Sequence, residues 1–401
     1  MVHVFHSLLF SFMFITLSNA ADVLQNPDFE IPPSNITENS TSQFLLLHQD
    51  QNPIPGWSFN GTVWYVTPAA NLSLPGNGHA IQLGENGQIN QTFKGVDDYY
   101  SDYILTFTLA APNEGCLQNS TAVNVSVLDQ RGDYRSQVFS LGRNLSRSLS
   151  VNFGFYLGYP TGEDSIHLEI KSVAPNSEQN VSCWPIIDNL LVRRNGPPIW
   201  YNGNIIPNGD FEVGPPINKN SSEGILLQEY EDPNSDNTHI LQRWSIFGTV
   251  KYIDSKHFKV PQGKAAIELI SGSPSGIRAD FPLGVKQNYN LLFTIGDAND
   301  SCVGDLLVFL QVGNDVRNFT LQSNGLGSVS NYSVSFVSSE LPGDTAIVFY
   351  REDETWATDG VLCGPVLDNI ALYSSSSNSG KMELWYRRVI FSLVVGFMII
   401  L

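Results

Sequence analysis

Apolar and polar residues alternate in several short stretches of the chain, as they do in β-strands with one buried face. Residues 103–109, 123–127 and 166–171 follow this pattern. Proline and glycine interrupt the chain about every 8 to 15 residues, and no stretch keeps a helical period for three turns. The pattern predicts an all-β chain whose antiparallel sheets pack as sandwiches or jelly rolls.

One of these stretches also predicts its own orientation. Val123, Val125 and Val127 alternate with Asn124 and Ser126, and the two polar residues belong to an Asn-X-Ser/Thr glycosylation sequon. A sequon needs an outward face. We therefore expect the valines to point into the core and Asn124 to point away from it.

The chain repeats its motifs once, in the same order, about 180 to 190 residues later. An Asn-X-Asp-Phe-Glu motif opens the copies at residues 26–30 and 208–212, and a Cys-X-Pro motif followed by two apolar residues and Asp-Asn closes them at 183–189 and 363–369. Solenoid repeats are only about 20 to 50 residues long. The long period indicates a duplicated domain.

The duplication predicts two modules, at residues 22–196 and 199–373, joined by a linker at residues 195–198. Each copy has about 175 residues, which is enough to bury a core of its own. We therefore expect two β-modules that pack independently of each other.

Two cysteines fall at matching places in each copy, and the pairing that respects the duplication joins Cys116 to Cys183 and Cys302 to Cys363. Each bridge would close a loop of some 60 to 70 residues. A zinc site is disfavoured because the chain has no close Cys-X-X-Cys pair.

Both ends of the chain carry targeting patterns. Residues 8–17 are apolar and small residues follow them, which predicts a signal peptide at residues 1–20. Small residues, a mostly polar spacer and an apolar tail at 374–401 predict a stalk and a glycosylphosphatidylinositol signal, with Asn378 as the attachment residue. The alternative is a short transmembrane tail. The ends predict a secreted protein anchored by lipid at the outer face of the plasma membrane.

Sequons are dense, as in a glycoprotein. Their asparagines are Asn35, Asn39, Asn60, Asn71, Asn90, Asn119, Asn124, Asn144, Asn180, Asn220, Asn299, Asn318 and Asn331.

The formal net charge is −18 at pH 7. This charge excludes nucleic acid as a partner. It would also repel polyanionic pectin, so a bound polysaccharide is expected to be neutral or bridged by calcium. Basic proteins are the partners that the charge favours.

The chain carries no catalytic signature, neither His-Glu-X-X-His nor Gly-X-Ser-X-Gly, phosphate loop or dinucleotide fingerprint. We therefore expect a protein that is not an enzyme. A polysaccharide-active hydrolase needs only two suitably spaced carboxylates, which leave no sequence signature, and that alternative stays open.

The acidic residues that recur between the copies suggest a metal site. Glu30 with Asp188, and Glu212 with Asp368, fall near the first and last strands of each copy, and such strands commonly lie side by side in a sandwich. Each pair could share a structural calcium with backbone carbonyls. The alternative is that these acids cap turns or hold backbone amides.

Trp57 and Trp244 recur between the copies, whereas Trp64 does not. Trp57 and Trp244 occupy the same place in each copy, which is typical of a core position. Trp64 corresponds to Lys251, so the fold does not require a ring there. An exposed Trp64 would be a stacking platform for carbohydrate binding, and a copy-specific packing change is the alternative.

The second copy resembles the plant cell-wall family known as domain of unknown function 642 at residues 253–258, 260–263, 296–299 and 363–368. The resemblance covers about residues 22–373 and implies two tandem galactose-binding-like β-sandwiches in the cell wall or apoplast. It also implies no enzymatic activity, and binding to wall polysaccharides and to pectin methylesterase. The opening motif looks like that of carbohydrate-binding modules with a structural calcium. The first copy departs from the family pattern at residues 113–116 and 183–185.

These observations predict a non-enzymatic protein of the cell surface and cell wall that binds polysaccharide and wall-modifying proteins such as pectin methylesterase. One alternative is a hydrolase with paired carboxylates. Another is a regulator of pectin methylesterase that binds protein alone.

Overall fold

The computed structural model describes residues 23–34, 43–51, 53–68, 74, 78–95, 102–117, 121–142, 144–159, 164–174, 183–196, 198, 200, 203–218, 222–230 and 240–375. The predicted signal peptide, Asn378 and the lipid-anchor tail lie outside these residues. So do six of the sequon asparagines, namely Asn35, Asn39, Asn71, Asn119, Asn180 and Asn220. Within the described part of the chain, no helix has the length and apolar character that a membrane crossing needs.

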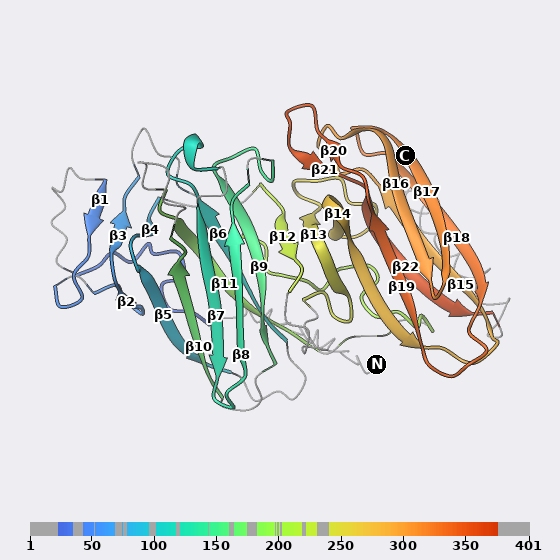
Figure 1. Ribbon diagram of the computed structural model, residues 1–401, viewed down its shortest axis with the longest axis horizontal. Helices are drawn as coiled ribbons and strands as arrows, with labels where there is room; N and C mark the ends of the chain where they lie inside the picture. The colour runs from blue at the N-terminus through green and yellow to red at the C-terminus, as the bar shows by residue number, and fades with distance from the viewer. Residues whose placement is uncertain are drawn as a thin grey trace, which may run out of the picture.

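The first module is a sandwich of two antiparallel sheets, blue to green in Figure 1. Its large sheet has the order β1-β3-β4-β11-β6-β9, with strands β1 (Phe44–Leu46), β3 (Val63–Val66), β4 (Ala80–Leu83), β11 (Ile186–Asn195), β6 (Asp102–Ala110) and β9 (Ser150–Gly158). Its small sheet has the order β2-β5-β10-β7-β8, with strands β2 (Ser58–Asn60), β5 (Gln88–Lys94), β10 (Ser165–Ser172), β7 (Ala122–Asp129) and β8 (Tyr134–Ser140). A 3-10 turn, η1 (Glu114–Leu117), follows β6.

The second module repeats this arrangement with two strands that pass from one sheet into the other. β13 (Ser245–Asp254) and β14 (Ala265–Pro282) belong to both sheets. They are joined in the large sheet by β12 (Ile225–Gln228), β22 (Val366–Ser374), β15 (Asn288–Gly296) and β18 (Val329–Val337), and in the small sheet by β19 (Asp344–Arg351), β16 (Val303–Val312) and β17 (Asp315–Asn324). A short ribbon of β20 (Thr355–Trp356) and β21 (Leu362–Cys363) lies beside them. The predicted fold class, two tandem all-β sandwiches, is confirmed.

The alternation of the sequence explains which faces are buried. In β7, Val123, Val125 and Val127 are at most 1% exposed, whereas Asn124 lies on the opposite, outer face, as predicted. Strand β6 differs, because it is buried on both faces. Its Thr106 hydroxyl donates to the Pro216 carbonyl of the second module at 2.9 Å. The second module therefore covers part of the outer face of the first module's large sheet.

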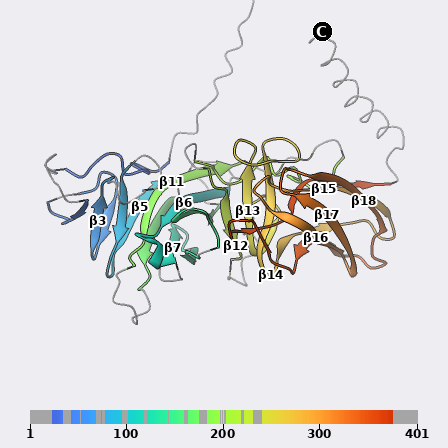
Figure 2. The same cartoon turned by 90° about the horizontal axis from the view of Figure 1, so that it is seen from above.

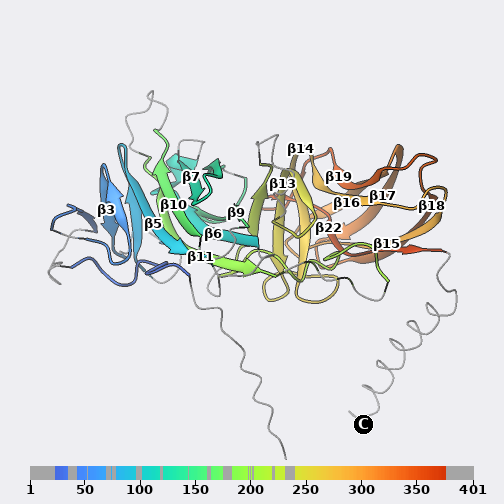
Figure 3. The ribbon, with the colours of Figure 1, turned by 90° about the horizontal axis from the view of Figure 1, so that it is seen from below.

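The two modules share one sheet. Ile225 and Leu226 of β12 pair in parallel with Asn152 and Phe153 of β9, so the two large sheets join edge to edge. Figure 1 shows β12 between β9 and β13, and Figures 2 and 3 show the two modules end to end from above and from below. Gly154 lies at the contact, where an added Cβ would be 2.5 Å from Leu227 Cδ2. A glycine is needed there for the modules to approach.

The cores of the modules also interlock. Leu226 and Ile270 of the second module belong to the buried cluster of the first, and Ile104 and Tyr156 of the first belong to that of the second. Asn195, expected in the linker, ends β11 and is 3% exposed. The expectation that the modules pack independently is wrong, because the edge strand β9 and the apolar face beside it are buried by the second module.

Candidate functional site

Three aromatic side chains lie in one row across the outer face of the second module's small sheet. Strand register sets the row, since Phe247 pairs with Gly276, Gly276 with Tyr350, and Tyr350 with Phe309. The ring centroids of Phe309 and Tyr350 are 5.2 Å apart with 21° between the planes, and those of Phe247 and Tyr350 are 6.5 Å apart. All three rings are half-buried, whereas Phe349 on the inner face is fully buried. Phe247, Tyr350 and Phe309 are named the aromatic row below.

Gly276 lets the aromatic row form. An added Cβ at this position would lie 2.7 Å from Phe247 Cζ and 2.8 Å from Tyr350 Cβ. A larger residue would therefore push the two rings off the sheet. The Phe247 ring and the Tyr350 side chain occupy the space that a side chain at this position would fill.

The aromatic row leads into a cleft of about 460 Å³ between the two modules. The second module lines the cleft with Phe247, Arg278 and Gln311, and the first contributes Gln137 and Tyr156. Arg278 follows Gly276 by two residues on β14, and Gln311 follows Phe309 by two residues on β16, so both share the outer face of the aromatic row. Cleft and row therefore form one continuous surface that both modules build.

A partly buried hydrogen bond fixes the wall of the cleft on the first module. The Tyr156 hydroxyl donates to Asp102 Oδ1 at 2.8 Å, and the Arg135 guanidinium lies 5.7 Å from the centre of the Tyr156 ring. Burial raises the pKa of Asp102 to about 6, although the Tyr156 hydrogen bond and the charge of Arg243 in the second module lower it. A carboxyl group with a raised pKa thus lies beside the junction.

Flat ring faces beside guanidinium and amide groups suit a ligand with apolar faces and a hydroxyl-rich edge. Arg278 donates two hydrogen bonds of 2.9 Å to Asp280, which orients its guanidinium, and Gln311 Nε2 donates to the Gly313 carbonyl at 2.8 Å. Among the described residues that line the cleft, Glu229 alone carries a carboxylate. The described part of the lining thus combines flat apolar ring faces with polar groups and includes one carboxylate.

The recurring acids lie at equivalent places in the two modules, with Glu30 and Glu212 beside the opening turns and Asp188 and Asp368 on the closing strands β11 and β22. Burial raises the pKa of Asp188 to about 9, and the charges of Glu30 and Asp28 add to this effect. Burial likewise raises the pKa of Asp368 to about 7, with contributions from Asp210 and Glu212. The structure thus brings each predicted Glu and Asp pair close enough to interact.

Both glutamates also hold backbone amides, as the alternative reading predicted. Glu30 Oε1 accepts from the His79 amide at 3.0 Å, and its Oε2 lies 2.7 Å from His79 Nδ1. Glu212 Oε1 accepts from the amides of Lys264 and Ala265 at 2.5 and 3.3 Å. These bonds tie the opening turn of each module to the large sheet.

The donor set is compatible with calcium, because each module offers two interacting carboxylates beside a turn whose carbonyl oxygens are hard ligands. The turns are alike, since Asn26 and Phe29 have φ of 48° and 54°, and Asn208 and Phe211 have 48° and 51°. In the part of the chain that the structure describes, no group of three His, Cys, Asp or Glu side chains is placed to hold a metal ion. Most ligands would have to come from the backbone, and the calcium sites stay a prediction.

The tryptophans divide as expected. Trp57 and Trp244 are 5% and 0% exposed and lie in the two cores. Trp64 is half-buried on the outer face of the large sheet, where its ring covers Gly84. Its counterpart Lys251 is 5% exposed and pairs with Glu268 at 3.1 Å. The structure thus places Trp64 in a packing contact away from the aromatic row, and its role as a sugar platform stays a prediction.

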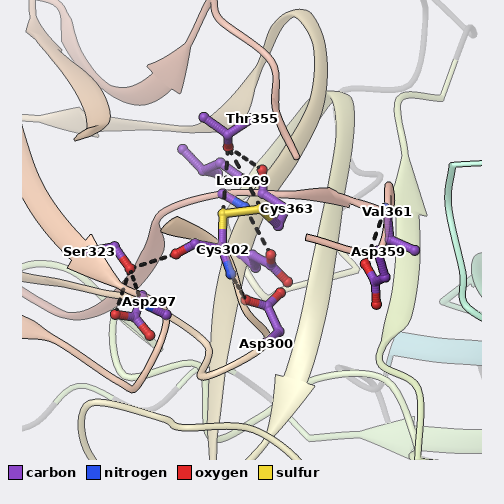
Figure 4. The surroundings of a disulfide bond; sticks show 12 residues. Leu269, Asp297, Asp300, Cys302, Ser323, Thr355, Asp359, Val361 and Cys363 are labelled. Atoms are coloured by element: carbon purple, nitrogen blue, oxygen red, sulfur yellow. Dashed lines mark hydrogen bonds between the residues drawn. A yellow bond between two sulfur atoms is a disulfide. The ribbon is translucent and has the colours of Figure 1, made fainter. Parts of the chain in front are cut away.

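Both disulfide bonds have the predicted pairing, Cys116 with Cys183 and Cys302 with Cys363. Figure 4 shows Asp297 and Ser323 beside the second bridge. Asp297 accepts from the Ser323 hydroxyl at 2.8 Å and from the amides of residues 299, 327 and 328 at 3.0, 2.5 and 2.7 Å. Burial acts to raise the pKa of Asp297, but these hydrogen bonds outweigh burial and together lower the pKa. Residues 296–299, which carry part of the family resemblance, therefore have a structural role through Asp297.

Sequence reasoning missed the aromatic row. Its three members lie on strands that are distant in sequence, and none of them recurs as an aromatic residue in the first copy. The available signal was alternation, because Phe309 follows the buried Val308 and Tyr350 follows the buried Phe349 in the sequence. Register between strands cannot be read from such a pattern alone.

The fold and the site define a tandem β-sandwich protein with a half-buried aromatic row on the outer face of its second module, beside the junction of the modules. The chain belongs to the family described as "Protein of unknown function (DUF642)", whose pattern matches residues 22–193 and 204–373. "Protein DUF642 L-GALACTONO-1,4-LACTONE-RESPONSIVE GENE 2" of Arabidopsis thaliana is 32% identical, over 90% of this chain and 93% of its own. "Protein TEEBE" of the same plant is 28% identical, over 87% of this chain and 90% of its own. The predicted family is confirmed.

Two solved structures are similar in part. The carbohydrate-binding module TmCBM61, solved in complex with β-1,4-galactotriose, is 16% identical and covers 43% of this chain and 99% of its own, with a TM-score of 0.28. The tandem CBM22 domains of Paenibacillus barcinonensis Xyn10C are 11% identical and cover 82% of this chain and 97% of their own, with a TM-score of 0.26. At these scores the likenesses carry no argument about the ligand of this chain.

Proposed function

We propose that this chain is a non-catalytic protein that binds a cell-wall polysaccharide across the aromatic row of its second module. One observation carries the proposal: Phe247, Tyr350 and Phe309 lie in a single cross-strand row on an outer sheet face. The row crosses three strand spacings, or about 14 Å, which allows contact with more than one sugar ring. Sugar rings have apolar faces that pack against aromatic rings. Arg278 and Gln311 of the cleft lining are placed to form hydrogen bonds with the hydroxyl groups of the sugar.

The expected ligand is a neutral polysaccharide. The chain carries a formal net charge of −18, so a polyanion would be repelled at long range. Arg278 is the cation of the cleft lining, and Asp280 already pairs with it. The described residues of the lining therefore offer no surplus positive charge for an acidic sugar.

Binding without hydrolysis is supported by the lining of the cleft. Glu229 is its one carboxylate among the described residues, and Glu229 Oε2 accepts from the Gly248 amide at 3.1 Å. A glycosidase needs a second acid about 5 to 9 Å away. Release of sugar that disappears in Glu229→Gln would favour the alternative, a hydrolase.

A location at the cell surface and in the cell wall belongs to the same proposal, with the signal peptide, the N-linked sugars and the lipid anchor that the sequence predicts. Pectin methylesterase or another basic wall protein is the proposed protein partner, because the acidic chain attracts basic surfaces. Co-precipitation of pectin methylesterase that weakens as salt rises would support this partner. Co-precipitation of pectin methylesterase that does not change with salt concentration would count against an electrostatic interface.

The binding proposal is tested with the full-length chain expressed in a plant secretory host and applied to a neutral and acidic glycan array. We expect Phe309→Ala and Tyr350→Ala each to weaken binding about tenfold, or about 1.4 kcal/mol. The matched control is Tyr134→Ala, which removes a ring that is 60% exposed on the first module. Equal binding by all three variants would contradict the proposal.

A further inference from the structure

The first module lacks the aromatic row at the equivalent positions. Asn60 is the counterpart of Phe247, because each directly precedes the glycine of a motif that recurs 187 residues later. From Asn60 the register of the small sheet runs through Gln88, Lys171 and Asn124 to Val138. The corresponding path in the second module runs through Phe247, Gly276, Tyr350, Phe309 and Asn318. Position by position, the three rings are replaced by Asn60, Lys171 and Asn124.

Two of these replacements are glycosylation sequons, and a third sequon lies beside them. Asn60 and Asn124 each begin a sequon, and so does Asn90, two residues beyond Gln88 on β5. Ile89 and Val125, the neighbours of Asn90 and Asn124 on their strands, are 0% exposed. Because side chains alternate along a strand, all three asparagines point to the outer face of one small sheet.

The contacts of two asparagines leave the amide nitrogen turned away from the neighbouring side chain. Asn60 Oδ1 accepts from Gln49 Nε2 at 2.9 Å, and Asn124 Oδ1 accepts from the Ser136 hydroxyl at 2.7 Å. Both bonds use the carbonyl oxygen, whereas an N-linked sugar attaches to the nitrogen. Folding therefore does not consume the atom that carries the glycan.

We infer that N-linked sugars on Asn60, Asn90 and Asn124 cover the outer face of the first module's small sheet, so that the protein presents one polysaccharide-binding face instead of two. The statement about binding rests on the proposed function. Five strands at about 4.8 Å spacing make a face about 20 Å wide, which branched glycans on β2, β5 and β7 span. The duplicated fold thus keeps one face for ligand and uses the other to carry sugar.

The second module keeps its aromatic row free of sequons. Its sequon on this face, Asn318, lies at the outer end of the path, on the edge strand β17. A glycan there would end the surface at the edge of the sheet, whereas the opposite end opens into the cleft at Phe247. We therefore expect a bound polysaccharide to extend from the aromatic row toward the junction.

Coverage is tested without any polysaccharide. Tyr134 and Val138 of β8 share the outer face with Asn124, and their side chains are 60% and 55% exposed on the protein surface. Glycopeptide mapping of the secreted chain is expected to show sugar at Asn60, Asn90 and Asn124. Hydroxyl-radical footprinting should then show at least threefold more oxidation of Tyr134 after enzymatic removal of glycans from the folded protein. Three empty sequons, or equal oxidation of Tyr134, would overturn the inference.

The number of binding faces is tested by titration with an oligosaccharide that the array selects. We expect one oligosaccharide per chain, and no binding in the double variant Phe309→Ala/Tyr350→Ala. Two per chain, or half the capacity left in the double variant, would overturn the inference while leaving carbohydrate binding intact. If no glycan binds at all, the proposed function fails, and the footprinting result still decides whether the face is covered.

Discussion

The Phe309 ring of β16 lies 5.2 Å from the Tyr350 ring of β19, nearly parallel to it, on the outer face of a sheet. The inner face of the same strands carries Phe349 and Val308, which fill the core. Aromatic rings on the outer face are not needed for the core, and their alignment by strand register makes a continuous flat surface. This relationship is what distinguishes the second module from the first, whose matching positions are polar.

Gly276→Ala should disturb the aromatic row and the sheet beneath it. The new Cβ would lie 2.2 Å from the Phe349 carbonyl oxygen and 2.7 Å from Phe247 Cζ, so the backbone or the ring must move. We expect a loss of about 1 to 3 kcal/mol in the free energy of unfolding, measured with urea, together with weaker glycan binding. Gly196→Ala, which adds a Cβ with nothing within 4 Å, is the control. Equal stability of both variants would argue against close packing at Gly276.

Gly154→Val should separate the modules. Its Cβ would lie 2.5 Å from Leu227 Cδ2 and 3.3 Å from Ile225 Cγ2, on the strand that continues the sheet. The wild-type protein is expected to unfold in one calorimetric transition, and the variant in two, with a larger radius of gyration in solution scattering. Ser335→Val, on the exposed edge strand β18, is the control. Two transitions already in the wild type would show that the modules are energetically separate.

Lys251→Met should destabilise the second module strongly. Lys251 lies 3.1 Å from Glu268, which is fully buried and also accepts from the Gly364 amide at 3.0 Å. Burial already raises the pKa of Glu268 to about 7, and the charge of Lys251 works against that rise. Removing one partner of a buried pair costs about 3 to 5 kcal/mol.

The control for this pair is the double variant Lys251→Met/Glu268→Gln, which leaves no charge to bury. Gln82 occupies the place of Glu268 in the first module, opposite Trp64. Chemical unfolding should show that the double variant recovers most of the lost stability. A single variant as stable as the wild type would mean that Glu268 is not held as a charge.

Asp102 should make stability depend on pH. Its folded pKa is raised to about 6 by burial, whereas the unfolded chain has the ordinary value of 3.8. Between about pH 4 and 6 the folded state holds a proton that the unfolded state has lost, so the free energy of unfolding falls as pH rises through this window. Asp102→Asn, whose oxygen can still accept from Tyr156, should remove this dependence.

The two-unit shift of Asp102 corresponds to at most about 3 kcal/mol of stability at neutral pH. Urea unfolding of the wild type and Asp102→Asn at pH 4, 5, 6 and 7 measures it. We expect the variant to gain on the wild type up to pH 6 and to hold a constant lead above it. Parallel curves at all four values would contradict a buried, protonated Asp102.

The sequence predicted much of this fold because its repeated motifs report local constraints. The valines of β7 and the position of Asn124 followed from alternation and a sequon, and both disulfide bonds followed from the duplication. The recurrence of Trp57 and Trp244 likewise predicted core positions. Each of these features depends on contacts within a single copy. The same contacts therefore occur in both copies, and a comparison of the two copies reveals them.

The junction and the aromatic row could not be predicted in the same way. The pairing of Leu226 with Phe153 joins the two copies. A comparison of one copy with the other does not reveal such a contact, because the contact lies between the copies. The aromatic row depends on register between β13, β14, β19 and β16, which alternation within each strand does not fix. The first copy has Asn60 and Asn124 where the second has Phe247 and Phe309, so a comparison of recurring residues did not detect the aromatic row.

The most direct test of the binding face is a crystal structure of the glycosylated chain with an oligosaccharide that the glycan array selects. We expect sugar rings packed against Phe309 and Tyr350, with hydroxyl groups in hydrogen-bond distance of Arg278 or Gln311. An oligosaccharide bound on the small sheet of the first module, or against Trp64, with the aromatic row bare, would contradict it.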